Sequence, residues 1–173
     1  MSFIASKNGY GYAPGWFLAE EDCSRETRTI PQNHAQVKTL ANGGKYVPMG
    51  TVFPSNDANA IGIVYEDVDV TTGDMPGSVV TAGVVYEDRL PDAADSYSSA
   101  TVPSGGNPKQ LGLYERSGSS PNYVYTLTTD TTAADGKTYY SYDGKLIPSA
   151  AKTALQGKGF RFVTVPTVTR PYN

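Results

Sequence analysis

The chain contains 173 residues, among them 18 glycines and 12 prolines, the two residue types that interrupt helices most strongly. Hydrophobic residues make up 39% of the chain and charged residues only 18%, and 13 residues are tyrosine, a side chain that favours pleated, half-buried surfaces. We therefore expect an all-β fold with little helix, and we exclude an architecture of long helices.

The net charge excludes two classes of partner, and the cysteine count excludes two kinds of structural site. A formal net charge of −3 argues against nucleic acid and against a membrane, because both attract basic surfaces. The single cysteine, Cys23, has no second thiol with which to form an internal disulfide or a zinc site. Residues 1–7 lack a basic region followed by an apolar run, so we expect a chain that is made and kept in soluble form.

Residues 1–42 follow no regular pattern. Glycines are mixed with aromatic residues at the start, a charged stretch follows, and no apolar stripe appears at helical spacing. We expect an extended arm that either orders on a neighbouring subunit or stays a mobile tail. The residues that would anchor this arm to a partner are Tyr10, Tyr12, Trp16 and Phe17.

Residues 43–91 read as a compact core of short strands. Alternating strand residues are broken by proline and glycine at short intervals, and residues 72–77 have the composition of a turn. The hexapeptide GIVYED at residues 62–67 is echoed by GVVYED at residues 83–88. One such pair is too little for a solenoid, so we interpret it as two related strand-to-turn corners of one small β fold.

The remaining sequence predicts a loop followed by further strands. Residues 92–108 are polar and read as a linker or surface loop. In residues 109–173 strand-like stretches return, and Asp143-Gly144 is typical of a two-residue hairpin turn. One helix is predicted from Ser149 to Gln156, with Ser149 as its cap, three alanines as strong helix formers and Gly157 as the stop. Residues 109–173 form either a C-terminal β lobe or the completion of the same domain.

Neither the single histidine nor the single cysteine has the neighbours that catalysis requires. His34 has no nucleophile and no orienting carboxylate beside it in the sequence, and Cys23 lies among acidic residues. Six acidic residues could in principle hold a hard cation or perform acid–base chemistry, but they match no known loop spacing. They are Glu66, Asp67, Asp69, Asp74, Glu87 and Asp88. We interpret them as turn residues and as ion-pair partners for Lys45, Arg89 or Lys109. We predict no enzyme activity, no cofactor and no metal site.

The tyrosines near the C-terminal end allow a carbohydrate-binding interpretation. Tyr139, Tyr140 and Tyr142 lie close together in the sequence, and exposed aromatic rings can stack on sugars. Because side chains alternate along a strand, Tyr140 and Tyr142 share one face and Tyr139 lies on the other. At least one of these faces is therefore expected to be core or subunit contact.

Several spaced motifs in residues 43–91 together resemble the head decoration and head fibre proteins of tailed bacteriophages. The motifs are KYVPMGTV at residues 45–52, GIVYED at 62–67, GDMPG at 73–77 and GVVYEDRL at 83–90. The resemblance implies a compact, short-stranded domain of β-barrel or β-tulip type, with an N-terminal arm and an optional second small β lobe.

The same resemblance implies a non-enzymatic virion protein that is made in the host cytoplasm and sits on the outer capsid surface. Its partners would be the major capsid protein and further copies of itself, commonly as a trimer. Residues 1–42 would form the capsid-binding arm, and Tyr10, Tyr12, Trp16 and Phe17 would be its anchors. The alternative is a carbohydrate-binding or host-receptor-binding phage structural component, served by the tyrosine-rich C-terminal half.

Overall fold

The computed structural model describes residues 14–164 and is mainly β, with 42% strand and 7% helix. This confirms the all-β prediction. The strands described form three open sheets, of five, four and three strands. A closed barrel, which the resemblance implied, is absent from residues 14–164, because the five-stranded sheet begins at β1 (Ser24–Ile30) and ends at β4 (Val52–Phe53), which do not pair with each other.

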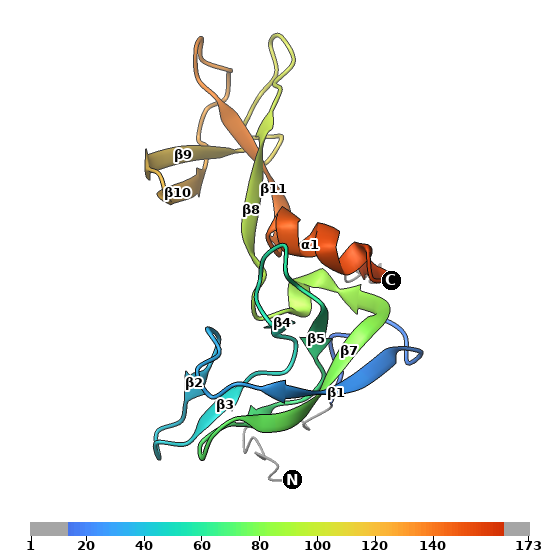
Figure 1. Ribbon diagram of the computed structural model, residues 1–173. Coiled ribbons are helices and arrows are strands. Elements are labelled where there is room, and N and C mark those ends of the chain that lie inside the picture. Colours follow the sequence, from blue (N-terminus) through green and yellow to red (C-terminus); the bar gives the residue numbers. More distant parts are fainter. Residues whose placement is uncertain (1–13, 165–173) are drawn as a thin grey trace, which may run out of the picture. The chain divides into compact units, whose positions relative to one another are not determined.

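The chain divides into two compact units (Figure 1). Of the described residues, unit 1 contains 14–93 and 147–164, and unit 2 contains 94–146. These boundaries differ from those we expected. The predicted linker at 92–108 contains strand β8 (Ala94–Ala100), and the predicted C-terminal lobe at 109–173 contributes its described residues to both units. Unit 2 is thus an insertion into unit 1.

Unit 1 is built around the longest strand, β7 (Met75–Tyr86). The five-stranded sheet has the order β1-β7-β5-β4, and β12 also pairs with β7, in parallel. A second sheet has the order β2-β3-β6. The remaining elements of unit 1 are β2 (Lys38–Thr39), β3 (Lys45–Val47), β5 (Gly62–Val64), β6 (Val68–Asp69), the 3-10 turn η1 (Glu87–Arg89), the helix α1 (Ser149–Gln156) and β12 (Phe160–Val163).

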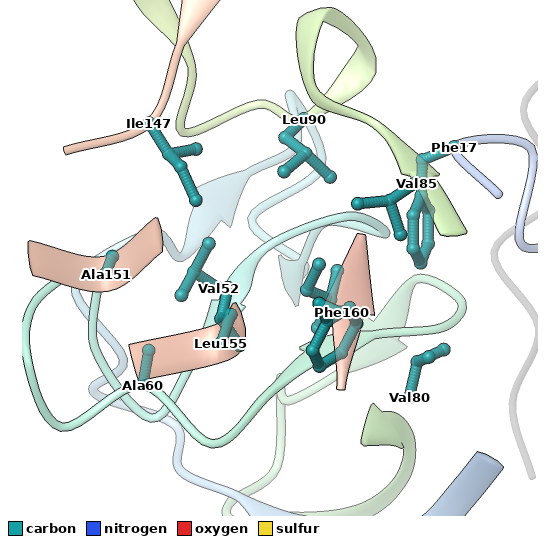
Figure 2. Close-up of a cluster of buried hydrophobic side chains, with 11 residues drawn as sticks. Phe17, Val52, Ala60, Val80, Val85, Leu90, Ile147, Ala151, Leu155 and Phe160 are labelled. Atoms are coloured by element: carbon teal, nitrogen blue, oxygen red, sulfur yellow. The ribbon is translucent and has the colours of Figure 1, made fainter. Parts of the chain in front are cut away.

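The central sheet is buried on both faces, because neighbouring residues of its strands enter two separate hydrophobic clusters. Ile63 and its cross-strand partner Val80 belong to the first cluster, whereas Val64 and its partner Val79 belong to the second. The first cluster also receives residues of α1 and β12 (Figure 2), and the second receives residues of β3 and β6. The tightest place is Gly62, where a Cβ atom would meet the Val80 carbonyl oxygen at 2.4 Å.

Residues 14–42 differ from the extended arm that we predicted. β1 pairs with β7 in antiparallel register over its whole length, and Leu18 forms a further antiparallel bridge to Val85. The Phe17 side chain is completely buried in the first cluster (Figure 2). This segment therefore hydrogen-bonds to the backbone of β7 and fills part of the core. It is ordered within unit 1 and does not need a partner to order it.

The predicted helix is present as α1, with Gly157 at its C-terminal end. The helix begins after Pro148 and has no side-chain cap, so Ser149 is its first residue and does not cap it. Its buried residues, Ala151 and Leu155, lie four positions apart on one face and pack into the first cluster. None of the helices among residues 14–164 is long and apolar enough to cross a membrane.

Unit 2 is a four-stranded antiparallel sheet with the order β10-β9-β11-β8. Its other strands are β9 (Tyr114–Ser119), β10 (Asn122–Leu127) and β11 (Tyr139–Leu146). The hairpin turn expected at Asp143-Gly144 does not form. β11 runs straight through these residues because it pairs with β8 on both sides of them, and the extra residue is accommodated as an irregularity between Tyr142 and Gly144.

Candidate functional site

The four predicted anchor residues have different positions. Tyr10 and Tyr12 lie outside the described residues. Trp16 and Phe17 are consecutive, and they point to opposite environments: the Trp16 side chain is 50% exposed, whereas Phe17 has no exposed surface. Phe17 is thus a core residue that fixes the backbone on which Trp16 is presented.

Trp16 is held in place by Arg89 of η1. The Arg89 Nη1 donates a hydrogen bond to the Trp16 carbonyl oxygen at 2.7 Å. The guanidinium carbon lies 4.7 Å from the centre of the Trp16 ring and 4.2 Å from the centre of the Tyr86 ring. Such cation–π contacts stabilise by roughly 0.5–1 kcal/mol each at exposed sites. The result is a fixed, half-exposed indole ring on the surface of unit 1.

Sequence reasoning named Arg89 only as an ion-pair partner for the acidic residues, and not as a contact of Trp16. The signal that pointed near it is the repeated hexapeptide, since the second copy ends at Asp88. In the first copy Tyr65 carries the same type of contact, because the Arg25 guanidinium lies 4.3 Å from its ring centre. The sequence repeat thus corresponds to two tyrosines, each covered by an arginine, at the ends of β5 and β7.

Four of the six acidic candidates accept hydrogen bonds within unit 1: Asp67, Asp69, Asp74 and Glu87. Asp67 accepts from the Met49 backbone N–H at 2.7 Å, and Asp74 accepts from the Gln32 backbone N–H at 2.8 Å. Among residues 14–164, no three His, Cys, Asp or Glu side chains come together in the manner of a metal site. We therefore assign them no shared site.

Glu87 has a different role from the other acidic residues. Its side chain is 3% exposed, and it accepts hydrogen bonds from the Ile147 backbone N–H at 3.1 Å and from the Lys152 Nζ at 2.6 Å. We expected the acidic residues to pair with Lys45, Arg89 or Lys109, but the cation that pairs with Glu87 is Lys152 of α1. This carboxylate ties the segment after unit 2 to the end of β7.

His34 and Cys23 are parts of the packing of unit 1. The His34 ring is 7% exposed and stacks on Phe53 with ring centres 6.2 Å apart. Its Nδ1 accepts a hydrogen bond from the Gln36 backbone N–H at 3.2 Å. Burial lowers the pKa of His34 below its ordinary value, although Asp92 opposes this shift. Cys23 is partly buried against the first hydrophobic cluster.

A second candidate site is the tyrosine-rich face of unit 2. Tyr97 stacks on Tyr125 with ring centres 4.0 Å apart, and it also contacts Tyr114 and Tyr142. Tyr125 in turn meets Tyr140 edge-on at 5.3 Å. We call these residues and the neighbouring Arg116 and Tyr123 the tyrosine face; its members are Tyr97, Tyr114, Arg116, Tyr123, Tyr125, Tyr140 and Tyr142.

The predicted separation of the three neighbouring tyrosines agrees with these contacts. Tyr140 and Tyr142 belong to the tyrosine face, whereas the Tyr139 hydroxyl donates to Asp130 at 2.7 Å, in a network that also contains Lys137. Tyr139 and Tyr140 are buried, and Tyr142 is 45% exposed. Tyr139 and Tyr140 thus belong to the core of unit 2, whereas Tyr142 belongs to its surface.

Arg116 is the charged member of the tyrosine face. Its guanidinium carbon lies 4.3 Å from the Tyr123 ring centre and 5.0 Å from the Tyr140 ring centre. Sequence reasoning missed Arg116, because only the pairing of β9 with β10, which places Arg116 opposite Tyr125, brings it among the tyrosines.

Large exposed hydrophobic side chains are concentrated in unit 2. Of the six such residues described, only Trp16 belongs to unit 1. The others are Leu111, Tyr123, Val124, Leu127 and Tyr142. Comparison with known proteins adds no relative to these observations: no family model, no curated protein and no solved structure matches the chain.

Proposed function

We propose that the chain is a non-enzymatic virion structural protein that binds the outer surface of a phage capsid, decorating and stabilising it. The proposal rests on the motifs of residues 43–91 and on one structural observation, the fixed and half-exposed ring of Trp16. In this proposal unit 1 is the attachment module, and the partners are the major capsid protein and further copies of the chain, arranged as a trimer.

Trp16 has the properties of a binding hot spot. Tryptophan and arginine are enriched among the residues that dominate interface energies, and here the two are in contact. Because Arg89 already holds the Trp16 backbone and ring, little side-chain entropy remains to be lost on binding. Many copies that bind only the assembled shell would stabilise it by mass action.

The test is binding of the full chain to empty capsids assembled from the major capsid protein of the phage that carries the gene. Cosedimentation should show saturable binding, and Trp16→Ala should weaken it by about tenfold or more. Leu111→Ala is the matched control, since Leu111 is 54% exposed but lies in unit 2, and it should bind as the unchanged chain does. Absence of capsid binding, or equal binding by Trp16→Ala, would refute the proposal.

A second candidate function is recognition of a saccharide or host receptor by unit 2, and the tyrosine face favours it. Tyrosine combines a rigid apolar ring with a polar hydroxyl, and two of these rings, Tyr123 and Tyr142, are 39% and 45% exposed. Binding to a panel of immobilised saccharides, lost in Tyr142→Ala, would support this function. It does not compete with capsid binding, since the two functions use different units.

A further inference from the structure

The tyrosine face contains one cation that no carboxylate neutralises. Among residues 14–164, ion pairs form at Arg28, Lys137 and Lys152, but Arg116 has neither an ion pair nor a hydrogen bond to a carboxylate. Its contacts are the rings of Tyr123 and Tyr140. The residue is nevertheless exposed, so its charge and its hydrogen-bond donors can meet a ligand.

The two rings also restrict how Arg116 can move. A guanidinium is planar and offers its donors in a fixed fork that matches a carboxylate in two parallel hydrogen bonds. Contact with two aromatic rings limits the rotamers of the side chain, so less entropy is lost when those bonds form. Arg116 is therefore better prepared to bind a planar anion than a solvated surface lysine would be.

Near Tyr142 the tyrosine face carries a carboxylate, a hydrogen-bond acceptor, instead of a cation. The Tyr142 hydroxyl donates to Asp95 Oδ1 at 2.9 Å, and Asp95 shares a face of β8 with Tyr97. Carboxylate oxygens accept hydrogen bonds and can receive the hydroxyl groups of a sugar. The face thus offers a cation, Arg116, beside Tyr123 and a carboxylate acceptor, Asp95, beside Tyr142.

These charges discriminate between classes of ligand. Unit 2 contains four basic and five acidic side chains, so it does not favour a polyanion such as a nucleic acid strand, which needs a row of cations. A neutral saccharide would leave Arg116 without a partner. A saccharide with a carboxylate on one sugar residue and free hydroxyls on the next fits both groups. Its carboxylate would pair with Arg116, and its hydroxyls would donate to the acceptor beside Tyr142.

We infer that the tyrosine face of unit 2 binds an acidic saccharide, whose carboxylate pairs with Arg116 and whose sugar rings lie against Tyr123 and Tyr142. This inference rests on the second proposed function, saccharide recognition by unit 2. It goes further by naming the chemical class of the ligand and the residue that selects it.

The test uses calorimetric titration of the full chain with three probes: a galacturonic acid trisaccharide, its methyl ester, and the corresponding neutral galactose trisaccharide. The acid should bind at least about tenfold more tightly than the ester and the neutral sugar. Arg116→Gln should remove this preference and Arg116→Lys should restore part of it. Lys109→Gln, which removes a charge from an exposed loop of the same unit, should leave the preference unchanged.

Two further variants separate the inference from the function on which it rests. Tyr123→Ala should weaken all saccharide binding, whereas Val124→Ala should not, because Val124 is exposed but lies on the opposite face of β10. If acid and ester bind equally and Arg116→Gln changes neither, the inference is wrong while saccharide recognition stands. If no probe binds the unchanged chain, the acidic-saccharide inference and the second function both fail.

Discussion

Replacing Lys152 is expected to destabilise the protein more than replacing Glu87, although the two residues form one ion pair. Glu87 is almost completely buried, whereas the Lys152 side chain is 31% exposed. Removing the lysine by Lys152→Met leaves a buried carboxylate with only the Ile147 N–H as a partner. Removing the charge of the acid by Glu87→Gln keeps an acceptor for that N–H and lets the lysine turn to solvent.

The free energy of unfolding that Lys152→Met is expected to remove lies between two limits. Breaking a fully buried pair destabilises by about 3–5 kcal/mol, and breaking an exposed one by about 0.2–1 kcal/mol. Because Lys152 is about one third exposed, we expect Lys152→Met to lower the free energy of unfolding of unit 1 by about 2–3 kcal/mol. Methionine keeps an apolar contact with Phe162, which the Lys152 Nζ approaches at 5.4 Å from the ring centre.

Urea unfolding followed by tryptophan fluorescence measures this directly, because Trp16 is the single tryptophan and belongs to unit 1. With a typical dependence of about 2 kcal/mol per molar urea, the midpoint of Lys152→Met should fall by about 1 M. The double variant Glu87→Gln/Lys152→Met should be more stable than Lys152→Met alone, since it no longer buries an unpaired charge. A loss below about 0.5 kcal/mol in Lys152→Met, or strictly additive losses in the double variant, would refute this reasoning.

Three further predictions concern unit 1 and use the same urea assay. Phe17→Ala should lower the free energy of unfolding by about 3–5 kcal/mol, because it empties a completely buried site; a loss under 1 kcal/mol would mean that Phe17 belongs to an arm after all. Gly62→Ala should destabilise by about 1–3 kcal/mol or more, since the new Cβ would meet the Val80 carbonyl oxygen at 2.4 Å; an unchanged midpoint would contradict this. Burial lowers the pKa of His34 below its ordinary 6.5, so the stability that depends on neutral His34 is complete above pH 6.5 and is lost as the pH falls towards the folded-state pKa. Between pH 7.5 and 5.5 the unchanged chain should therefore lose more stability than His34→Gln, and equal losses would contradict the assignment.

Features governed by neighbouring residues were predictable from the sequence. The alanines of 149–156 and Gly157 define α1 locally, and the structure has the helix over those residues. The alternation of side chains along a strand placed Tyr140 and Tyr142 on one face and Tyr139 on the other, in agreement with the ring contacts.

Features that depend on distant residues were not predictable. Phe17 looked like an anchor for a partner because nothing nearby in the sequence covers it, whereas it is buried in the first cluster, which joins residues of β7, α1 and β12. Asp143-Gly144 has the composition of a hairpin turn, but pairing with β8 outweighs that local preference. The candidate site on unit 2 required Arg116 of β9 to meet Tyr140 of β11, and single-residue patterns carry no information on such pairings.

The way in which the chain leaves and re-enters unit 1 has a consequence for engineering. The chain departs after Ala93, whose N–H bonds to the Leu90 carbonyl at 3.0 Å, and it returns at Ile147, held by Glu87. The first and last residues of the insertion, Ala94 and Leu146, are cross-strand partners. The two ends of unit 2 therefore lie next to each other. Residues 94–146 could be exchanged for another small domain whose termini are adjacent, and unit 1 would keep both of its hydrophobic clusters.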